Sequence, residues 1–307
     1  MTVETAAYAI LDDRGLVAVG GEDRAAFLQG LVSNDVLRVG ENRAAYALLL
    51  TPQGKFLHDF RMVESAGALL LDPEAERRAE LLRRLKMHKL RSKITLEDRS
   101  EGAGGVGGMA VVALFGGDAL ARLGLPEEAG AARPFAGGVA FTDPRLPALG
   151  ARAILPQEGL AAALEEAGFA RRGAEDYDRH RLALGVPDGS RDLIPEKSIP
   201  LENDLDDLNA ISWDKGCYMG QELTARTKYR ALIRKKLFPV AVDGPLPAPG
   251  TPVTLDGREA GEMRSGRGSS ALALLRLEEL ARAEQDGTPL KAGESTVVPR
   301  KPGWASF

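Results

Sequence analysis

The sequence has 307 residues, of which 44% are hydrophobic and 27% charged, proportions typical of a folded globular protein with two or three domains. Its 40 Lys and Arg residues against 44 Asp and Glu residues give a net charge of −4, which excludes a general attraction to nucleic acids or anionic membranes. The single cysteine, Cys217, excludes an intramolecular disulfide and a zinc site built from several thiolates.

The N-terminal part alternates short apolar segments with turn residues. Two apolar runs between Ala9 and Val19, separated by turn residues 12–15, predict a β-hairpin. Helical spacing of apolar residues predicts a helix over Glu22–Val32. A meander of three strands is expected next, over residues 44–50, 56–63 and 68–71. Asp72, followed by Pro73, is the expected N-cap of the next helix.

This next helix carries an unusual concentration of basic residues. They are Arg77, Arg78, Arg83, Arg84, Lys86, Lys89, Arg91 and Lys93. The first interpretation is a solvated helix face; the alternative is contact with an anion such as RNA, a folate polyglutamate or an acidic partner protein. A second basic patch consists of Arg226, Lys228, Arg230, Arg234, Lys235 and Lys236.

The pattern changes in the C-terminal quarter of the chain. Helices are expected over 157–167 and 174–184, whereas from Lys236 onward short apolar runs alternate with Gly, Pro and Asp, which predicts a small β-domain. We therefore predict an α+β fold with one region over residues 1–235 and a second domain over residues 236–307.

The segment DKGCYMGQELTAR, residues 214–226, is the strongest candidate for chemistry. Cys217 lies between Gly216 and Gly220, two residues after Lys215 and just ahead of a helix expected to begin near Gln221. The lysine, the loop amides and the positive helix end would all favour the thiolate and lower the pKa of the thiol. The alternative is a buried cysteine that acts as a small apolar residue.

Two further chemistries are conceivable for Cys217. A cysteine–histidine nucleophile would need His58, His88 or His180 to approach it through the tertiary fold, and nothing in their spacing indicates that. One thiolate cannot supply the ligands of an iron–sulfur cluster, so no resident metal is expected, although Cys217 could be a transient ligand of a cluster shared between proteins.

The octapeptide KGCYMGQE, Lys215 to Glu222, resembles the signature of the YgfZ-type folate-binding family and of its mitochondrial counterpart in iron–sulfur cluster assembly. The segments AAFLQGLVSNDV and LLLTPQGKFLHDF are similar to the glycine-cleavage aminomethyltransferase. The resemblance covers about two-thirds of the chain. It implies two interleaved ferredoxin-like domains around a folate cavity, plus a C-terminal β-barrel, with tetrahydrofolate or a derivative as cofactor.

The resemblance also implies roles for single residues. It places Cys217, Lys215 and Asp59 at the chemistry, and at the cofactor it places Asn34, Asp59, Arg181, Tyr218, Gln221, Glu222 and Arg226. Two departures are visible: His58 replaces the first of two paired aspartates, and Ala183 replaces the glutamate that holds the pterin. Because alanine cannot accept those hydrogen bonds, aminomethyl transfer is disfavoured, unless Glu222 or Glu202 compensates.

The function implied by the resemblance is support for the assembly, maturation or repair of [4Fe–4S] proteins, including enzymes that modify tRNA. The protein would then be an accessory factor rather than an enzyme, with iron–sulfur assembly proteins and apo-enzymes as partners and no direct need for tRNA. The alternatives are a folate-dependent one-carbon transferase or demethylase that uses Asp59, and a tRNA-binding module.

The expected location follows from the first residues of the sequence. The start, MTVETAAYAILDDRG, lacks a secretory signal, and no apolar stretch of 18 residues is present. We therefore expect a cytoplasmic protein that has no membrane partner.

Overall fold

The computed structural model describes residues 5–100, 108–229 and 233–307, and these form two compact units. Unit 1 comprises Met1–Leu50, Leu57–Tyr177 and Leu208–Met219. Unit 2 comprises Thr51–Phe56, Asp178–Asp207 and Gly220–Phe307. Each unit therefore combines segments that are far apart in the sequence.

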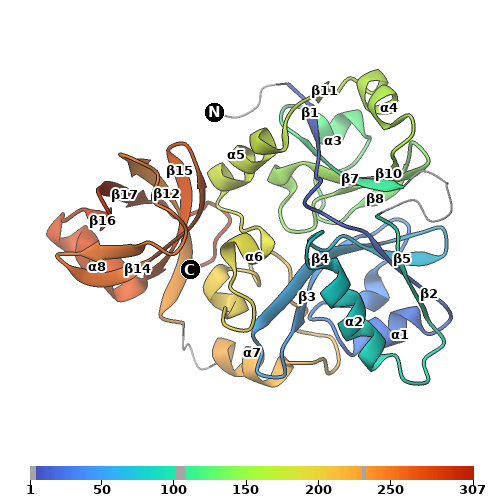
Figure 1. The fold of residues 1–307 in the computed structure, drawn as a ribbon, viewed down its shortest axis with the longest axis horizontal. Helices are drawn as coiled ribbons and strands as arrows, with labels where there is room; N and C mark the ends of the chain where they lie inside the picture. Colours follow the sequence, from blue (N-terminus) through green and yellow to red (C-terminus); the bar gives the residue numbers. More distant parts are fainter. Residues whose placement is uncertain (1–4, 101–107, 230–232) are drawn as a thin grey trace. The chain divides into compact units, whose positions relative to one another are not determined.

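Unit 1 contains two sheets that alternate along the chain (Figure 1). The six-stranded sheet has the order β11-β1-β7-β10-β9-β8, with β1 Ala7–Ile10, β7 Met109–Phe115, β8 Ala132–Phe135, β9 Gly138–Thr142, β10 Ala151–Pro156 and β11 Ala170–Arg171. The five-stranded sheet has the order β3-β4-β5-β2-β6, with β2 Val17–Gly20, β3 Ala45–Leu50, β4 Phe56–Ser65, β5 Ala68–Leu71 and β6 Thr95–Asp98. The chain leaves the first sheet after β1 and returns to it at β7, so the two sheets are interleaved.

Helices cover the outer face of each sheet in unit 1. Their bounds are α1 Arg24–Gln29, η1 Val36–Arg38, α2 Arg78–His88, α3 Ala119–Arg122, η3 Pro147–Leu149, α4 Leu160–Glu166 and α5 Ala174–Leu184, the last of which continues into unit 2. Leu28 of α1 and Leu81 of α2 pack on the five-stranded sheet, and Leu164 of α4 packs on the six-stranded sheet. A third apolar cluster, which includes Val63 and Phe141, joins the inner faces of the two sheets.

The predicted hairpin of residues 9–19 is wrong, although both of its strands exist. β1 pairs with β7 and β11, whereas β2 pairs with β5 and β6, so the turn between β1 and β2 carries the chain from one sheet to the other. Local turn chemistry does not distinguish a hairpin from a crossing between sheets, because the same residues serve both. The predicted meander β3-β4-β5 is confirmed.

The predicted N-cap at Asp72 is also wrong. Helix α2 begins at Arg78 with Arg77 as its N-cap, and Asp72 is instead fully buried. Its carboxylate accepts hydrogen bonds from the Arg61 amide at 2.7 Å and from Arg152 Nη1 at 3.1 Å. The Asp72 side chain therefore forms a buried ion pair and does not cap the helix.

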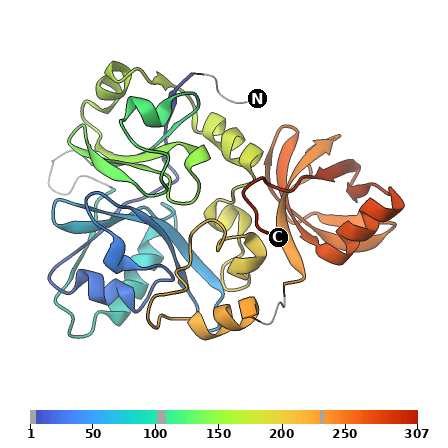
Figure 2. The same cartoon turned by 180° about the vertical axis from the view of Figure 1, so that it is seen from behind.

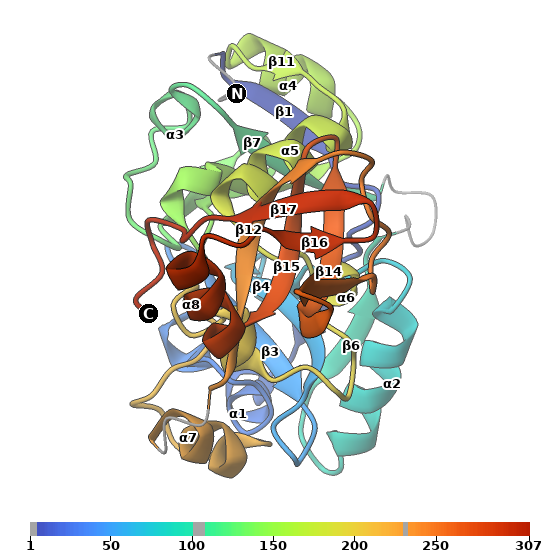
Figure 3. The same cartoon turned by 90° about the vertical axis from the view of Figure 1, so that its left-hand side faces the viewer.

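Unit 2 is built around a closed barrel of the C-terminal residues, in the order β12-β15-β14-β13-β16-β17 (Figure 3). The bounds are α6 Gly189–Asp192, η4 Pro200–Asn203, α7 Gln221–Tyr229, β12 Lys235–Asp243, β13 Pro252–Leu255, β14 Arg258–Arg267, β15 Ser270–Arg276, α8 Leu277–Asp286, β16 Leu290–Ala292 and β17 Ser295–Pro299. The view from behind in Figure 2 shows this barrel in orange and red. Closure pairs every barrel strand on both sides, which leaves no exposed sheet edge.

An α+β fold with a C-terminal barrel is therefore confirmed, and the barrel begins at Lys235. Leu182 of α5 packs in unit 2 with Leu237, Leu272 and Leu274 of the barrel. None of the helices in the described parts of the chain is both long and apolar enough to cross a bilayer.

Candidate functional site

The Cys217 loop, which we define as residues 208–219, follows η4 and ends just before α7. The thiol of Cys217 is exposed and unoxidised. In the described ranges 5–100, 108–229 and 233–307, no side chain forms a hydrogen bond or ion pair with it. The alternative of a buried, apolar cysteine is therefore excluded.

Lys215 holds this loop through a buried ammonium group. Its Nζ donates hydrogen bonds to the carbonyl oxygens of Gln29 at 2.8 Å, Val32 at 2.7 Å and Asn34 at 2.7 Å. The ammonium also lies 5.2 Å from the ring centre of Tyr218, which is buried. Burial lowers the pKa of Lys215 to about 8, and Asp35 opposes that shift. The three carbonyls use all three donors of the ammonium, so its role in the structure is to tie the loop to the chain that follows α1.

Four more hydrogen bonds attach the same loop to the same segment. The amide of Ser212 donates to the Ser33 carbonyl at 3.0 Å, and the Met219 amide donates to the Gly30 carbonyl at 3.2 Å. Ser33 Oγ donates to the Ala210 carbonyl at 2.6 Å, and Asn34 Nδ2 donates to the Asn209 carbonyl at 2.7 Å. The loop is thus fixed along its length while the thiol faces solvent.

A polar cavity of about 310 Å³ adjoins the Cys217 loop within unit 1. The loop contributes Asn209, Trp213 and Asp214 to its lining, and Asn34 and Tyr46 also line it. The side-chain amide of Asn34 donates to the carbonyls of Tyr46 and Asn209, both at 2.7 Å, so Asn34 shapes the cavity wall. Arg38 and Arg43 add two cations to the lining.

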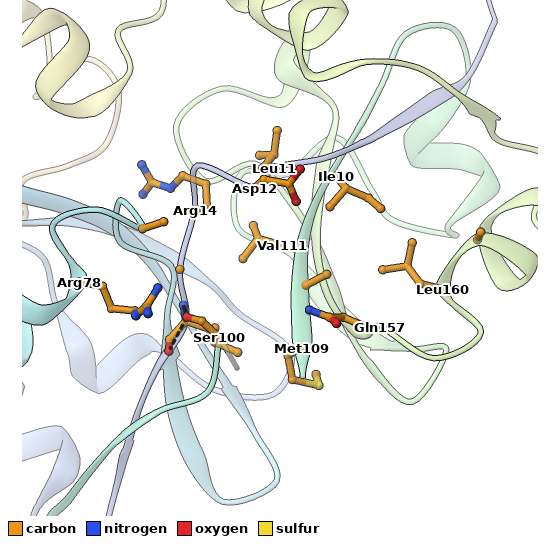
Figure 4. A pocket seen from close by; sticks show the side chains of 15 residues that line it. Ile10, Leu11, Asp12, Arg14, Arg78, Ser100, Met109, Val111, Gln157 and Leu160 are labelled. Carbon is orange, nitrogen blue, oxygen red and sulfur yellow. Dashed lines mark hydrogen bonds between the residues drawn. The ribbon is translucent and has the colours of Figure 1, made fainter. Parts of the chain in front are cut away.

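A second cavity in unit 1, of about 480 Å³, lies away from the predicted residues (Figure 4). Its lining comes from the turn after β1, strand β7 and the start of α4, with Leu11, Val111 and Leu160 on the apolar side. Ser100 at its edge accepts a hydrogen bond from the Leu16 amide at 2.6 Å. None of the site residues predicted from the sequence is part of the lining of this cavity among the described residues.

Asp59 lies in a layer of buried charges between the two sheets of unit 1. Its Oδ2 accepts a hydrogen bond from the Tyr46 hydroxyl at 3.0 Å, and Arg14 approaches its Oδ1 at 3.9 Å. Burial and the Asp59 carboxylate raise the pKa of Tyr46 well above its usual value, which keeps the phenol protonated as a donor. The side chain of Asp59 is 1% exposed, so its contacts are internal ones.

Arg61 is the least satisfied member of this layer. Its guanidinium lies over the Tyr46 ring, 5.2 Å from the ring centre, and 3.8 Å from Asp72 Oδ1. Among the described residues none accepts a hydrogen bond from its Nε, Nη1 or Nη2. Burial, followed by repulsion from Arg145 and Arg152, lowers the pKa of Arg61. Net positive charge therefore accumulates in this layer.

Two neighbouring arginines, Arg145 and Arg152, donate hydrogen bonds to carboxylate and hydroxyl groups. Arg145 donates to Asp143 through two nitrogens, at 3.0 and 2.8 Å, and to the Tyr177 hydroxyl at 3.1 Å. Arg152 donates to the same hydroxyl at 3.1 Å. Burial raises the pKa of Asp143, but Arg145 and its hydrogen bonds outweigh burial and leave the pKa below its usual value.

Arg181 is buried in unit 2 and lies at the centre of another ion-pair network. It donates to Asp178 Oδ1, Asp192 Oδ2 and Ser265 Oγ, each at 2.8 Å, and to the Val186 carbonyl at 3.1 Å. These contacts join α5, α6 and strand β14. The predicted cofactor role of Arg181 stays a prediction, and the structure adds a stabilising role.

The three remaining predicted residues belong to α7 in unit 2. Gln221 is the first residue of the helix, as the sequence predicted, and Glu222 pairs with Arg226 at 2.8 Å on an exposed face. Glu202, the other carboxylate considered for the pterin, is half-buried in the same unit, and burial raises its pKa. Their roles at a cofactor stay predictions.

Sequence reasoning missed the loop residue Trp213 and assigned no role to Asp214, and both line the cavity next to Cys217. Their adjacency to the KGCYMGQE segment was the available signal. It also missed Tyr46 and Arg61, because the charged layer forms only when two sheets from separate chain segments pack together.

Comparison with known proteins gives consistent matches. Residues 234–307 match the family described as "CAF17, C-terminal beta-barrel domain". The iron–sulfur cluster assembly factor IBA57, mitochondrial, of Mus musculus is 37% identical over 94% of this chain and 81% of its own length. The Homo sapiens protein of the same name is 36% identical over 88% of this chain and 77% of its own.

A solved structure has the same fold. Glycine cleavage system aminomethyltransferase T from Bartonella henselae matches 97% of this chain and 85% of its own, with a TM-score of 0.74 and 16% sequence identity. The predicted aminomethyltransferase-like fold is thereby confirmed, whereas an identity this low carries no information on activity.

The relatives contradict one expectation. A cytoplasmic location was predicted from the first residues, but the matched assembly factors are mitochondrial proteins. The prediction of a cytoplasmic location is therefore wrong. Transfer into an organelle uses a different targeting signal, so the absence of a secretory signal does not bear on it. On the strength of identity and coverage together, the chain belongs to the IBA57 family of iron–sulfur cluster assembly factors.

Proposed function

We propose that this protein is a folate-binding accessory factor that supports the assembly, maturation or repair of [4Fe–4S] proteins, with Cys217 as its functional thiol. The observation that carries the proposal is the exposed thiol on a loop fixed by Lys215 beside a polar cavity. Family membership supports the role in iron–sulfur cluster assembly.

The polar groups of the cavity beside the Cys217 loop fit a folate in chemical character. Asp214 is an exposed carboxylate that can accept hydrogen bonds from the N–H groups of a pterin, and the Trp213 ring lines the same space. Arg38 pairs with Asp35 at 3.1 Å and Arg43 pairs with Glu128 at 3.0 Å, and both can bind the glutamyl carboxylates through their remaining N–H groups. A volume of about 310 Å³ is near the lower limit for small-molecule sites, so one end of the ligand would extend out of the cavity.

Each component then has a defined task. Tetrahydrofolate, when bound, would supply a reduced pterin close to the loop. Lys215 fixes the backbone, and the exposed Cys217 thiol is available to a partner as the source of one cluster ligand, with the iron–sulfur cluster as cargo. Apo-proteins that receive [4Fe–4S] clusters, including enzymes that modify tRNA, are the proposed recipients.

The alternative, a one-carbon transferase that uses Asp59, gains no support from the site. Asp59 accepts the Tyr46 hydroxyl and lies near Arg14, and its side chain is 1% exposed. A carboxylate enclosed in this way is poorly placed to bind a reacting amine.

Anaerobic calorimetric titration with tetrahydrofolate tests the folate part. We expect saturable binding to the wild-type chain and to Cys217→Ala, because the thiol is not part of the cavity lining. Asp214→Asn and Arg43→Met should each weaken binding about tenfold. Gln157→Ala, in the 480 Å³ cavity, is the matched control. Absence of binding at millimolar ligand, or weakening by the control alone, would remove folate from the proposal.

A further inference from the structure

The basic cluster of residues 77–93 divides into two groups in the structure. The first group serves the fold: Arg77 Nη2 donates to Glu80 at 2.9 Å, and Arg84 Nη2 lies 2.8 Å from the same carboxylate group. Arg78 pairs with Asp98 at 2.5 Å, and Lys93 pairs with Glu22 at 3.0 Å. Half of the basic side chains are therefore neutralised by acidic neighbours.

The second group, which we name the α2 patch, consists of Arg83, Lys86, Met87, Lys89, Leu90 and Arg91. Within the parts of unit 1 that the structure describes, no acidic side chain pairs with any of its four cations. Met87 is 61% exposed and Leu90 is 88% exposed, so two apolar side chains lie among unpaired positive charges. Isolated exposed apolar residues are common, but their combination with four free cations on one short segment is not explained by folding.

Leu90 is held in an unfavourable backbone conformation. Its φ angle is 44°, in the left-handed region that bulky residues avoid. The turn around it is closed by the Ser92 amide, which donates to the Lys89 carbonyl at 2.8 Å. An exposed leucine in this conformation receives no compensation from packing in the described chain, which is the pattern of strain kept at a binding site.

The turn is also anchored on its C-terminal side. The Lys93 amide donates to Asp23 Oδ2 at 2.7 Å, and Ile94 is buried in the core beneath α2. Gly21 allows this close approach, because a Cβ there would lie 2.1 Å from the Lys93 carbonyl oxygen. Leu90 therefore projects from a fixed turn and can be presented to a partner at little cost in conformational entropy.

We propose that the α2 patch is a docking surface for a partner protein whose contact face is acidic and contains an apolar pocket for Leu90. An apolar centre within a charged rim is the anatomy of a protein–protein interface, and methionine adapts its shape to such partners. RNA is disfavoured because His88 is the single aromatic side chain between residues 77 and 93 on which a base can stack, and the net charge of −4 repels a polyanion at long range. This proposal does not depend on folate or on Cys217.

The test uses the full chain and a synthetic probe. A fluorescein-labelled helical peptide of about 18 residues, with leucines at i, i+3 and i+4 spacing and glutamates on its other faces, represents the partner chemistry. Fluorescence anisotropy should show binding that weakens as salt is raised. A peptide with serine in place of leucine should bind at least tenfold more weakly.

Variants of the patch decide the outcome. Leu90→Ser should weaken peptide binding about tenfold, and Lys86→Glu combined with Lys89→Glu should abolish it and its salt dependence. Val298→Ser, at a half-exposed residue of the barrel, is the matched control and should have no effect. Equal binding to the wild-type chain and Leu90→Ser would overturn the proposal. So would tighter binding of tRNA, or of phosphatidylglycerol vesicles, that the Lys86 and Lys89 substitutions abolish.

Discussion

Two regions of unit 1 bury positive charge in opposite ways. Beneath the Cys217 loop a single ammonium, that of Lys215, makes three hydrogen bonds to carbonyl oxygens. Between the two sheets four arginines meet three aspartates, and Arg61 is left without a hydrogen-bond acceptor among the described residues. The three hydrogen bonds of the Lys215 ammonium group hold the loop in place, with the Cys217 thiol exposed. In the layer between the sheets, the missing acceptors of Arg61 leave an unfavourable electrostatic energy.

The largest effect is expected when the Lys215 ammonium group is removed. Lys215→Met leaves three buried carbonyls without a donor, so we expect a loss of about 4 kcal/mol in the free energy of unfolding, measured with urea. In the folded fraction, hydrogen exchange of residues 208–219 should accelerate. The exposed Lys291→Met is the matched control and should change neither quantity. Unchanged stability together with unchanged exchange would show that the ammonium does not hold the loop.

Removal of a carboxylate from the crowded layer should have the next largest effect. Asp59→Asn keeps the shape of the side chain but removes a negative charge near Arg14 and Arg61, so a loss of about 3 kcal/mol in the free energy of unfolding is expected. Denaturant unfolding at neutral pH measures it. Asp256→Asn, on an exposed turn, is the control. An equal effect of both substitutions would contradict a special role for the buried charge.

His58 lies at the edge of the same layer and should make the free energy of unfolding depend on pH. Burial, with repulsion from Arg77, lowers the pKa of His58 to about 4, against an ordinary value of 6.5. Between these two values the unfolded chain binds a proton that the folded chain does not, so stability falls as pH decreases from 6.5 to 4. At pH 4.5 this difference in proton binding lowers the free energy of unfolding by roughly 2 kcal/mol.

The readout for His58 is the pH slope of stability rather than its absolute value. Glu80 lies 3.7 Å from the imidazole; burial raises its pKa, but hydrogen bonds from Arg84 and Arg77 outweigh burial and leave the pKa below its usual value. The wild-type chain is therefore compared with His58→Phe, which retains Glu80. The variant should lose less stability between pH 7 and 4.5 than the wild-type chain. Parallel curves would show that the imidazole is protonated as easily in the fold as in the unfolded chain.

The smallest expected effect has the opposite sign. Arg61→Met removes a cation that lacks acceptors and is repelled by Arg145 and Arg152, while it keeps the length of the side chain. We expect an increase of about 1 kcal/mol in the free energy of unfolding. A clear loss of stability would show that the ion pairs with Asp59 and Asp72 outweigh the missing hydrogen bonds.

The contrast also explains what the sequence could predict. The start of α7 at Gln221 and the barrel strands follow from local patterns, and the structure agrees with them. Proximity in the sequence suggested that Lys215 acts on the Cys217 thiol, but the fold turns its ammonium group toward three carbonyl oxygens. Its role at a functional site stays a prediction. A side chain's partner is decided by tertiary contacts that no local pattern records.

The charged layer could not be predicted from the sequence for the same reason. Asp72 has the local features of an N-cap, yet it pairs with Arg152, which is 80 residues away in the sequence. Tyr46 and Asp59 lie on neighbouring strands of one sheet, but Arg145 reaches the Tyr46 ring from the loop after β9 of the other sheet. A contact between segments so far apart in the sequence leaves no local pattern.

We propose that a fixed loop presents Cys217 for the maturation of [4Fe–4S] proteins. The most direct measurement is the activity of a [4Fe–4S] enzyme, relative to a [2Fe–2S] enzyme, in cells that lack the endogenous family member and express variants of this chain at equal levels. We predict that wild-type and Arg61→Met restore the [4Fe–4S] activity, whereas Cys217→Ser and Lys215→Met do not. Full restoration by Cys217→Ser would contradict the account.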